Sequence, residues 1–171
     1  MSRTLLLMRH AKSSWKQSDL PDHERPLKRR GESDAYAVAE AMRRVRLAPD
    51  LIVTSTAVRA RSTAKRVLHA FGGNIEMIQD GRLYDAMPSA YLHVMKDLPS
   101  ESQTALIIGH NPAISDFCTL IADRQVKLRT ADVVQIELPI PDWSHYRIER
   151  DEGHVVLVLS RRAITAASEH R

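Results

Sequence analysis

The sequence predicts an α/β fold in which helix, sheet and helix layers form one domain. Short, almost continuous apolar runs recur along the chain, which is typical of strands buried on both faces of a mostly parallel sheet. Between them lie longer segments whose apolar residues repeat at helical spacing, and such alternation favours an α/β architecture. A length of 171 residues suits a single domain with a sizeable core.

The composition argues against several classes of protein. Hydrophobic residues make up 43% of the chain and charged residues 27%, which is typical of a globular protein. The single cysteine, Cys118, has no partner in the chain, so a reducing compartment is expected. The net charge of +4 comes without a basic stripe interleaved with aromatic residues, so nucleic acid is not an expected partner. No apolar run is long enough to cross a membrane, and we expect a cytoplasmic protein without a membrane partner.

The chain begins with a predicted strand, a long loop and a helix. Residues 3–8 form a nearly continuous apolar run that predicts a buried strand. Residues 11–30 are polar and contain two prolines, which indicates a long loop. In residues 31–45 apolar side chains recur at i, i+3, i+4 and i+7, so a helix with one buried face is expected.

Further strands and helices follow in alternation. Residues 51–54 predict a second strand, and Ser55 stands where the N-cap of the next helix would lie. Ser55 could instead form a hydrogen bond near a pocket at the end of this strand. Small and apolar residues within 57–71 form one helical face, and two glycines end that helix. Residues 75–78 predict another strand, and a short helix is expected to begin at Pro88.

The last part of the domain contains more predicted strands than helices. A strand at 104–108 precedes a helix at 114–121, and two strands are expected at 133–138 and 155–159. An additional strand near 145–150 is plausible between turn-forming prolines and a glycine. Because this end has the pattern of a β-hairpin, one antiparallel strand is expected in the sheet. The domain is expected to span residues 1–160, with a polar C-terminal tail at 161–171.

Charged side chains follow several of the predicted strands. Arg9 and His10 follow the first strand, Arg59 comes shortly after the second, and His110 follows the strand at 104–108. Arg25 lies in the loop that leaves the first strand. In open α/β sheets ligands gather outside the carboxyl ends of the strands, so these five side chains are expected to converge on one pocket.

Such a pocket would suit a tetrahedral oxyanion. Arginine presents a planar fork of donors that matches the oxygens of a phosphate group. A neutral imidazole is a competent nucleophile, and the surrounding arginines would stabilise the charge of a transferring phosphoryl group. Each residue also has a structural alternative, such as a solvated side chain or a turn residue, but their joint placement after strands favours a site.

Three motifs in this order resemble the histidine phosphatase superfamily. Residues 7–11, Leu-Met-Arg-His-Ala, resemble its Arg-His-Gly signature with alanine in the third place. Residues 55–64 and 109–112 resemble its second and third motifs. Residues 25–31 and 83–86, with the short length, resemble the SixA branch of small bacterial phosphohistidine phosphatases. The resemblance covers about residues 3–160 and implies a phosphoglycerate mutase-like three-layer fold.

The resemblance also implies a role for each residue of the pocket. His10 would be the nucleophile and form a covalent phosphohistidine, while Arg9 and Arg59 would bind phosphate and His110 would complete the core of the site. Arg25 would reach the phosphate as well. No metal ion and no organic cofactor is implied.

A general acid is not evident in the sequence. Many members of the superfamily that cleave phosphate esters carry a glutamate or aspartate after the central strand, where this chain has Arg82. Asp80 and Asp85 are the nearby candidates, and each could equally be a turn residue. Expelling an alkoxide requires a proton, whereas imidazole is a much weaker base that can leave neutral. A weak or missing acid therefore favours a phosphohistidine substrate.

Two other residues of the first loop are candidates for the site. Ser13 is a candidate phosphate donor, although capping or solvent contact would also explain a serine there. Trp15 could contact a substrate or cover the pocket, or it could anchor the loop as a partly buried side chain.

The resulting hypothesis is a phosphatase that hydrolyses phosphohistidine on a protein and so takes part in signal transduction. The first alternative is a small-molecule phosphatase of the same superfamily, which a working acid at Asp80 or Asp85 would favour. The second is a non-catalytic module that binds a phosphorylated ligand. The presence of His10 argues against this module, because binding alone does not require a nucleophile.

Overall fold

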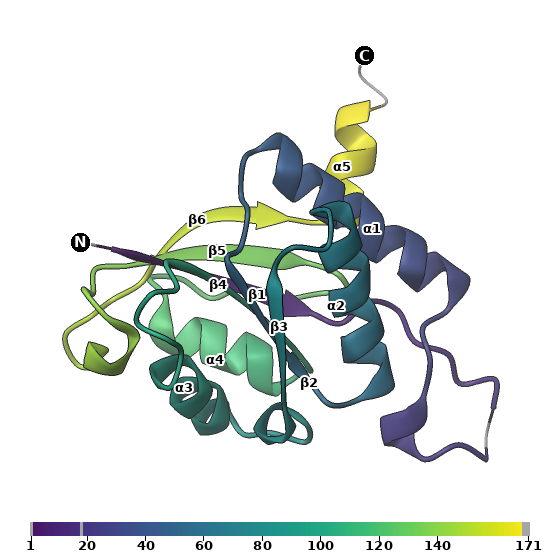
Figure 1. The fold of residues 1–171 in the computed structure, drawn as a ribbon, viewed down its shortest axis with the longest axis horizontal. Helices are drawn as coiled ribbons and strands as arrows, with labels where there is room; N and C mark the ends of the chain where they lie inside the picture. The colour runs from purple at the N-terminus through teal and green to yellow at the C-terminus, as the bar shows by residue number, and fades with distance from the viewer. Residues whose placement is uncertain (1, 18, 169–171) are drawn as a thin grey trace.

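A computed structural model describes residues 2–17 and 19–168, which fold around a six-stranded sheet of order β3-β2-β4-β1-β5-β6 (Figure 1). The strands are β1 (Arg3–Arg9), β2 (Leu51–Ser55), β3 (Glu76–Asp80), β4 (Thr104–Gly109), β5 (Val133–Leu138) and β6 (His154–Leu159). Neighbouring strands pair in parallel except at β5, which is antiparallel to both β1 and β6. The predicted mostly parallel sheet with one antiparallel strand is confirmed.

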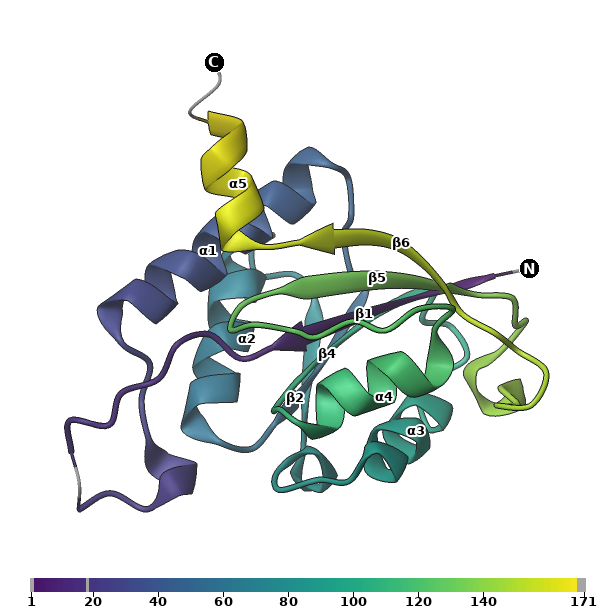
Figure 2. The ribbon, with the colours of Figure 1, turned by 180° about the vertical axis from the view of Figure 1, so that it is seen from behind.

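Helices cover both faces of this sheet. The helices are α1 (Arg29–Arg44), α2 (Val58–Ala70), α3 (Pro88–Lys96), α4 (Ala113–Ile121) and α5 (Arg161–Ser168). Helices α1, α2 and α5 lie on one face and α3 and α4 on the other, as the two opposite views show (Figures 1 and 2). This confirms the three-layer prediction. No helix within residues 2–17 and 19–168 is long and apolar enough to cross a membrane.

The alternation of side chains along β1 explains the two layers. Leu5 and Leu7 pack into the apolar cluster that contains residues of α3 and α4. Leu6 and Met8 pack into the opposite cluster, which contains residues of α1 and α2. Successive residues of a strand point to opposite faces, so a continuous apolar run is what a strand covered on both faces requires.

The register of the central strands brings distant residues to one edge of the sheet. β1 and β4 are parallel neighbours in which Arg9 pairs with Gly109, and His10 N–H donates to the carbonyl of Gly109 over 3.0 Å. Strand β2 pairs with β4 on the other side and ends at Ser55. The residues that follow β1, β2 and β4 therefore meet at the carboxyl edge, as expected for a ligand site in a parallel sheet.

Of the two roles expected for Ser55, the N-cap is wrong and the hydrogen bond near the pocket is formed. Ser55 is the last residue of β2, and the N-cap of α2 is Ala57, which has no side-chain capping bond. The Ser55 hydroxyl instead accepts a 3.3 Å hydrogen bond from Ala57 N–H and contacts the ring of His110 at 2.8 Å. A tertiary partner on β4 has replaced the local role.

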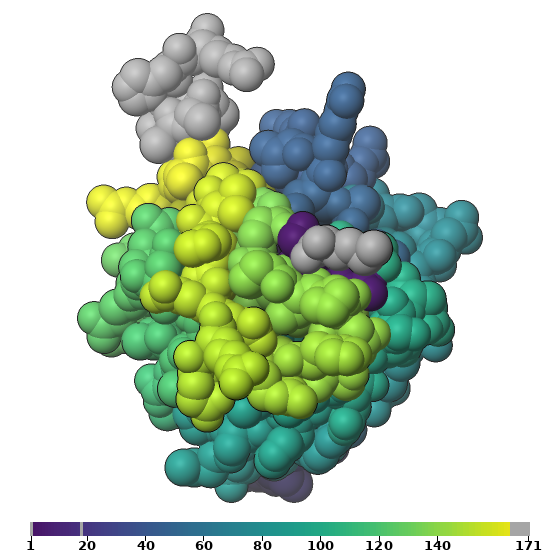
Figure 3. All heavy atoms as spheres, turned by 90° about the vertical axis from the view of Figure 1, so that its left-hand side faces the viewer, coloured from purple at the N-terminus to yellow at the C-terminus, as the bar shows by residue number. Residues whose placement is uncertain are grey.

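The additional strand expected near 145–150 is not formed. This region contains a short 3₁₀ turn, Trp143–His145, and then further turns before β6. Trp143 and Tyr146 are buried, and Trp143 donates its ring N–H to the carbonyl of Ser102 over 2.8 Å. Anchoring by these two aromatic side chains holds the segment as a compact loop, which forms the lime-coloured surface at this end of the molecule (Figure 3). It lies at the opposite end of β1 from His10, because Arg3 donates to the carbonyl of Pro141.

The segment expected as a polar tail begins as helix α5. Ile164 packs against the apolar cluster of α1 and α2, and Arg161 pairs with Asp34 of α1 at 3.3 Å. Residues 169–171, including His170, lie outside the described residues. The division of the chain at residue 160 stays a prediction.

Candidate active site

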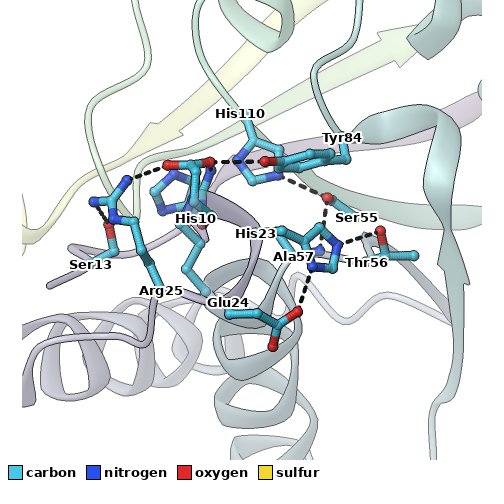
Figure 4. A network of polar contacts seen from close by, with 12 residues as sticks. His10, Ser13, His23, Glu24, Arg25, Ser55, Thr56, Ala57, Tyr84 and His110 are labelled. Atoms are coloured by element: carbon cyan, nitrogen blue, oxygen red, sulfur yellow. Dashed lines mark hydrogen bonds and ion pairs between the residues drawn. The ribbon is translucent and has the colours of Figure 1, made fainter. Parts of the chain in front are cut away.

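The four residues of the predicted core lie together at the carboxyl edge of the sheet. Arg9 ends β1 and His10 follows it, Arg59 is in the first turn of α2, and His110 follows β4. The ring centroids of His10 and His110 are 5.0 Å apart, and their residues are only 8% and 9% exposed. Figure 4 shows both rings between Arg25 and Tyr84.

The surroundings of His10 leave one ring nitrogen free to act as a nucleophile. Nδ1 lies 2.7 Å from the carbonyl oxygen of Ala11, and because a carbonyl only accepts, we assign the proton to Nδ1. The lone pair is then on Nε2. Burial, together with the positive charges of Arg59 and Arg9, lowers the pKa of His10 to about 4, against the smaller opposing effect of the Ala11 hydrogen bond. The ring is therefore neutral at pH 7.

Hydrogen bonds to both its backbone and its ring fix the position of His110. Its backbone N–H donates to the hydroxyl of Tyr91 over 2.9 Å, and its Nε2 lies 2.8 Å from Ser55 Oγ. The hydroxyl of Tyr91 also lies so close to Gly109 that a Cβ there would collide with it, which explains the glycine. Burial, and then the neighbouring His10, lower the pKa of His110 to about 3, so this ring is neutral as well.

Two arginines of the site share one carboxylate, that of Asp22 in the 3₁₀ turn Asp22–Glu24. Arg25 Nη1 donates to Asp22 Oδ1 over 2.7 Å, and Arg59 Nη2 donates to Oδ2 over 2.9 Å. The hydroxyl of Tyr84 also donates to Oδ2, over 3.0 Å. Burial opposes ionisation, but these three hydrogen bonds prevail and hold the pKa of Asp22 well below its usual value. The sequence analysis did not identify Asp22 as a residue of the site. Its position three residues before Arg25 was the one feature that could have indicated an ion pair between them.

Two polar groups at the site are buried without a hydrogen-bond partner among residues 2–17 and 19–168. They are Arg9 Nε and His110 Nδ1. Within the described residues the Arg9 guanidinium makes one long hydrogen bond, of 3.4 Å from Nη1 to the carbonyl of Leu128. Burial lowers the pKa of Arg9, and the charge of Asp132 opposes this effect. Buried polar groups are almost always paired, so the unpaired Nε–H donor of Arg9 beside His10 indicates a place for an anion.

Ser13 and Trp15 both contact Arg25. Ser13 Oγ accepts from Arg25 Nη2 over 2.8 Å, and the carbonyl of Ser14 accepts from Nε over 3.0 Å. The guanidinium lies 3.2 Å from the centroid of the Trp15 ring, and Trp15 is 72% exposed. Trp15 is therefore not a partly buried anchor of the loop, but an exposed ring on which a buried arginine stacks.

The two candidate acids have different surroundings. Asp80 accepts hydrogen bonds from the side chain and the backbone of Arg82. The side-chain hydrogen bond has the largest effect and lowers the pKa of Asp80, although burial raises it somewhat. Asp85 is exposed and lines a cavity of about 230 Å³ together with Asp22, Arg59, Tyr84 and His110. Of the two candidates, Asp85 therefore shares a cavity with His110, and its role as an acid stays a prediction.

Tyr84 and His23 also belong to this cluster, although no sequence pattern indicated a role for either side chain. Tyr84 makes edge-to-face contacts with His110, at 5.7 Å between ring centroids, and with His23, at 4.7 Å. His23 Nε2 lies 3.0 Å from Thr56 Oγ1, on the segment between β2 and α2. These contacts join the long first loop to the rest of the site.

The remaining cavities and side-chain clusters of the described residues lie away from this site or lack its chemistry. A larger hollow of about 880 Å³ lies between α1, α5 and residues 129–132, and none of the predicted site residues lines it. Within the described residues no group of three or more histidine, cysteine, aspartate or glutamate side chains is arranged to hold a metal ion. Cys118 is buried in the core, and burial raises its pKa to about 11.

Comparison with known proteins agrees with these features. The family model of the histidine phosphatase superfamily (branch 1) matches residues 5–91. An uncharacterized chloroplastic protein of Arabidopsis thaliana is 30% identical, with 84% of this chain and 70% of the relative covered. The structure of a candidate phosphohistidine phosphatase SixA from Nakamurella multipartitia is 25% identical, with a TM-score of 0.79. The match covers 93% of this chain and 96% of that one.

A second solved structure, the protein histidine phosphatase SixA complexed with tungstate, shares the fold at a TM-score of 0.79. It is 16% identical, with coverage of 94% of this chain and 99% of that one. The fold is thus the phosphoglycerate mutase-like fold of histidine phosphatases. With a family model that spans half of the sequence, and with its motif residues gathered around His10, the chain belongs to the histidine phosphatase superfamily.

Proposed function

We propose that the protein hydrolyses phosphohistidine on another protein through a covalent phosphohistidine on His10. The observation that carries this proposal is a neutral, buried His10 whose Nε2 has no hydrogen-bond partner among residues 2–17 and 19–168, beside the unpaired Nε–H donor of Arg9. In this proposal Arg9, Arg25 and Arg59 bind the phosphoryl oxygens, and the assigned role of His110 is to complete the oxygen contacts.

The reaction takes place in two displacements at phosphorus. First, the substrate imidazole takes a proton from solvent, His10 Nε2 attacks the phosphorus atom, and the P–N bond of the substrate breaks so that its imidazole leaves neutral. Second, a water molecule attacks the phosphorus of phospho-His10, the new P–N bond breaks, and inorganic phosphate leaves. The hydrogen bond from Nδ1–H to the Ala11 carbonyl keeps the reacting lone pair on Nε2 before the attack and restores it there when the P–N bond breaks.

The leaving group supports phosphohistidine over a phosphate ester. An ester must expel an alkoxide, to which a positioned acid contributes about 10²–10⁴-fold. Asp22 is held ionised by two arginines and Asp80 by Arg82, so neither has a proton to donate in this arrangement. Imidazole, with a pKa near 6.5, depends far less on such an acid.

The short connections around the site support a protein substrate. Helix α2 ends at Ala70 and β3 begins at Glu76, which leaves no insertion that could form a lid at this point. The cavity beside His110 is about 230 Å³, too small to enclose a large metabolite. A phosphohistidine exposed on a phosphotransfer domain or carrier could reach His10, and removal of its phosphoryl group would act in signal transduction.

A small-molecule phosphatase is the second candidate, and the position of Asp85 favours it. Asp85 lines the same cavity as His110, from which a carboxylic acid could protonate an ester oxygen. In that case Asp85→Asn would lower kcat for the ester by about 10²-fold or more. For phosphohistidine, the same variant is expected to keep its rate within about threefold, because little protonation is needed.

The decisive experiment compares substrates with wild type and His10→Ala. Phosphate release is measured from a phosphohistidine-bearing protein and from a panel of sugar and nucleotide phosphate esters. Selective release from phosphohistidine that is lost in His10→Ala would support the proposal. Preference for an ester would favour the small-molecule phosphatase. Phosphate binding without release from any substrate would favour a non-catalytic binding module.

A further inference from the structure

The arginines assigned to the phosphoryl group already hold an anion, the carboxylate of Asp22. Arg25 Nη1 and Arg59 Nη2 each donate to one of its oxygens, over 2.7 and 2.9 Å. Arg59 Nη1 donates in addition to the backbone carbonyl of Asp22. Both terminal nitrogens of Arg59 therefore contact this one residue, in the forked geometry by which arginine also recognises phosphate.

Charge makes this arrangement incompatible with a bound phosphoryl group. The hydrogen bonds from both arginines and from Tyr84 keep Asp22 ionised, so its carboxylate is negative at neutral pH. Two like charges that share the same donors at hydrogen-bond distance repel strongly, and burial of the arginines reduces the screening by water. An incoming phosphoryl group must therefore replace the carboxylate.

The carboxylate is the partner that is free to move. The side chains of Arg25 and Arg59 are 9% and 8% exposed, whereas that of Asp22 is 46% exposed. Arg25 is also held by Ser13 Oγ, the carbonyl of Ser14 and the Trp15 ring, and none of these contacts involves Asp22. The Asp22 side chain has solvent beside it and belongs to a three-residue 3₁₀ turn within a long loop.

We propose that Asp22 is an autoinhibitory residue whose carboxylate competes with the phosphoryl group for Arg25 and Arg59. In the empty site its carboxylate pairs the two arginines, and a phosphoryl group displaces it on binding. Asp22 thereby weakens the binding of phosphate and favours release of the product. The inference rests on the proposed function only in taking these arginines as the phosphoryl site, not in the identity of the leaving group.

The test is the affinity for inorganic phosphate, measured by isothermal titration calorimetry at pH 7. Asp22→Asn removes the charge in nearly the same volume, and we expect it to bind phosphate on the order of tenfold more tightly than wild type. Glu24→Gln is the matched control, since it removes a charge from the same 3₁₀ turn, and Glu24 contacts His23 at 2.9 Å. Its affinity is expected within about twofold of wild type.

Unchanged or weaker binding by Asp22→Asn would overturn the proposal. Weaker binding would mean that Asp22 positions the two arginines for phosphate instead of competing with it. Equally tight binding by Glu24→Gln and Asp22→Asn would overturn it as well, because the effect would then be one of overall charge. No measurable binding in wild type or Asp22→Asn would show that the arginines do not form an anion site.

A second variant and a crystal structure test the proposal independently of any folding defect in Asp22→Asn. Asp22→Ser is also expected to bind phosphate more tightly than wild type. Thermal unfolding would verify that both variants are folded. In a crystal structure with phosphate, the Asp22 carboxylate should lie beyond hydrogen-bond distance of both arginines, and retention of both bonds would contradict the proposal. Because phosphate is the product of every phosphatase, these results hold even if phosphohistidine proves not to be the substrate.

Discussion

The imidazole rings of His10 and His110 lie 5.0 Å apart between their centroids, tilted by 56°. They follow two parallel neighbouring strands at paired positions, since Arg9 is opposite Gly109 in the register of β1 and β4. Both rings are neutral because burial lowers both pKa values. Two neutral imidazoles at this separation can contact one phosphoryl group from two sides, which is the geometry on which the following predictions depend.

Replacing Arg59 should impair both binding and turnover. Arg59→Ala removes a fork of donors that is expected to contact the phosphoryl group in the ground state and in the transition state. We expect a higher KM and a kcat lowered by about 10²-fold or more, measured by steady-state phosphate release. Arg66→Ala is the matched control on the same helix, because Arg66 pairs with Glu32 on the surface. Unaltered kinetics of Arg59→Ala would remove Arg59 from the site.

Ser55 should act by positioning His110. Ser55→Ala deletes the hydroxyl that lies 2.8 Å from His110 Nε2 and leaves this buried nitrogen unpaired. We expect kcat to fall by about tenfold with little change in KM, since the hydroxyl orients a ring that acts in the transition state. A fall in thermal stability without any change in kcat would indicate a purely structural role.

Stability should depend on pH through the two buried histidines. Their pKa values are about 4 and about 3 in the folded protein, below the value of about 6.5 expected when unfolded. As pH falls from about 6.5 towards 4, the unfolded chain binds protons that the folded protein does not. The free energy of unfolding should therefore decrease by about 1.4 kcal/mol per pH unit for each histidine across this window.

Urea denaturation between pH 4.5 and about 7 would measure this slope. His10→Ala should lose the contribution of one histidine, whereas His69→Ala, at an exposed position of α2, should keep the slope of wild type. The same titration predicts that kcat/KM declines as pH falls below about 4, because a proton on Nε2 blocks attack. An equal slope in wild type and His10→Ala would contradict the assigned direction of the pKa shift.

Gly109 should not tolerate a side chain. In Gly109→Ala the new Cβ would collide with the Tyr91 hydroxyl, which also accepts from His110 N–H. Overpacking of this kind costs about 1–3 kcal/mol of stability. Tyr91→Phe removes the colliding oxygen, so the double variant should be less destabilised than the sum of the two single variants. Additive effects in thermal or urea unfolding would argue against the collision.

Much of the fold followed from periodicity in the sequence. The apolar run of β1 and the helical spacing of α1 identify both elements, because a buried strand and an amphipathic helix each require their own period. Errors arose where a side chain has a distant partner. Of the two roles expected for Ser55, the local N-cap was wrong because its hydroxyl contacts the ring of His110. The segment near 145–150 is a loop because Trp143 and Tyr146 anchor it.

The sequence by itself determined which side chains reach the edge of the sheet. Arg9, His10 and His110 directly follow apolar strands, and the ends of parallel strands share an edge whatever the details of packing. Only the tertiary structure decided what Arg25 and Arg59 contact, because the path of the long loop that carries Asp22 depends on α2 and Tyr84. Polar loops lack a hydrophobic period, so their contacts are set by the surfaces on which they fold.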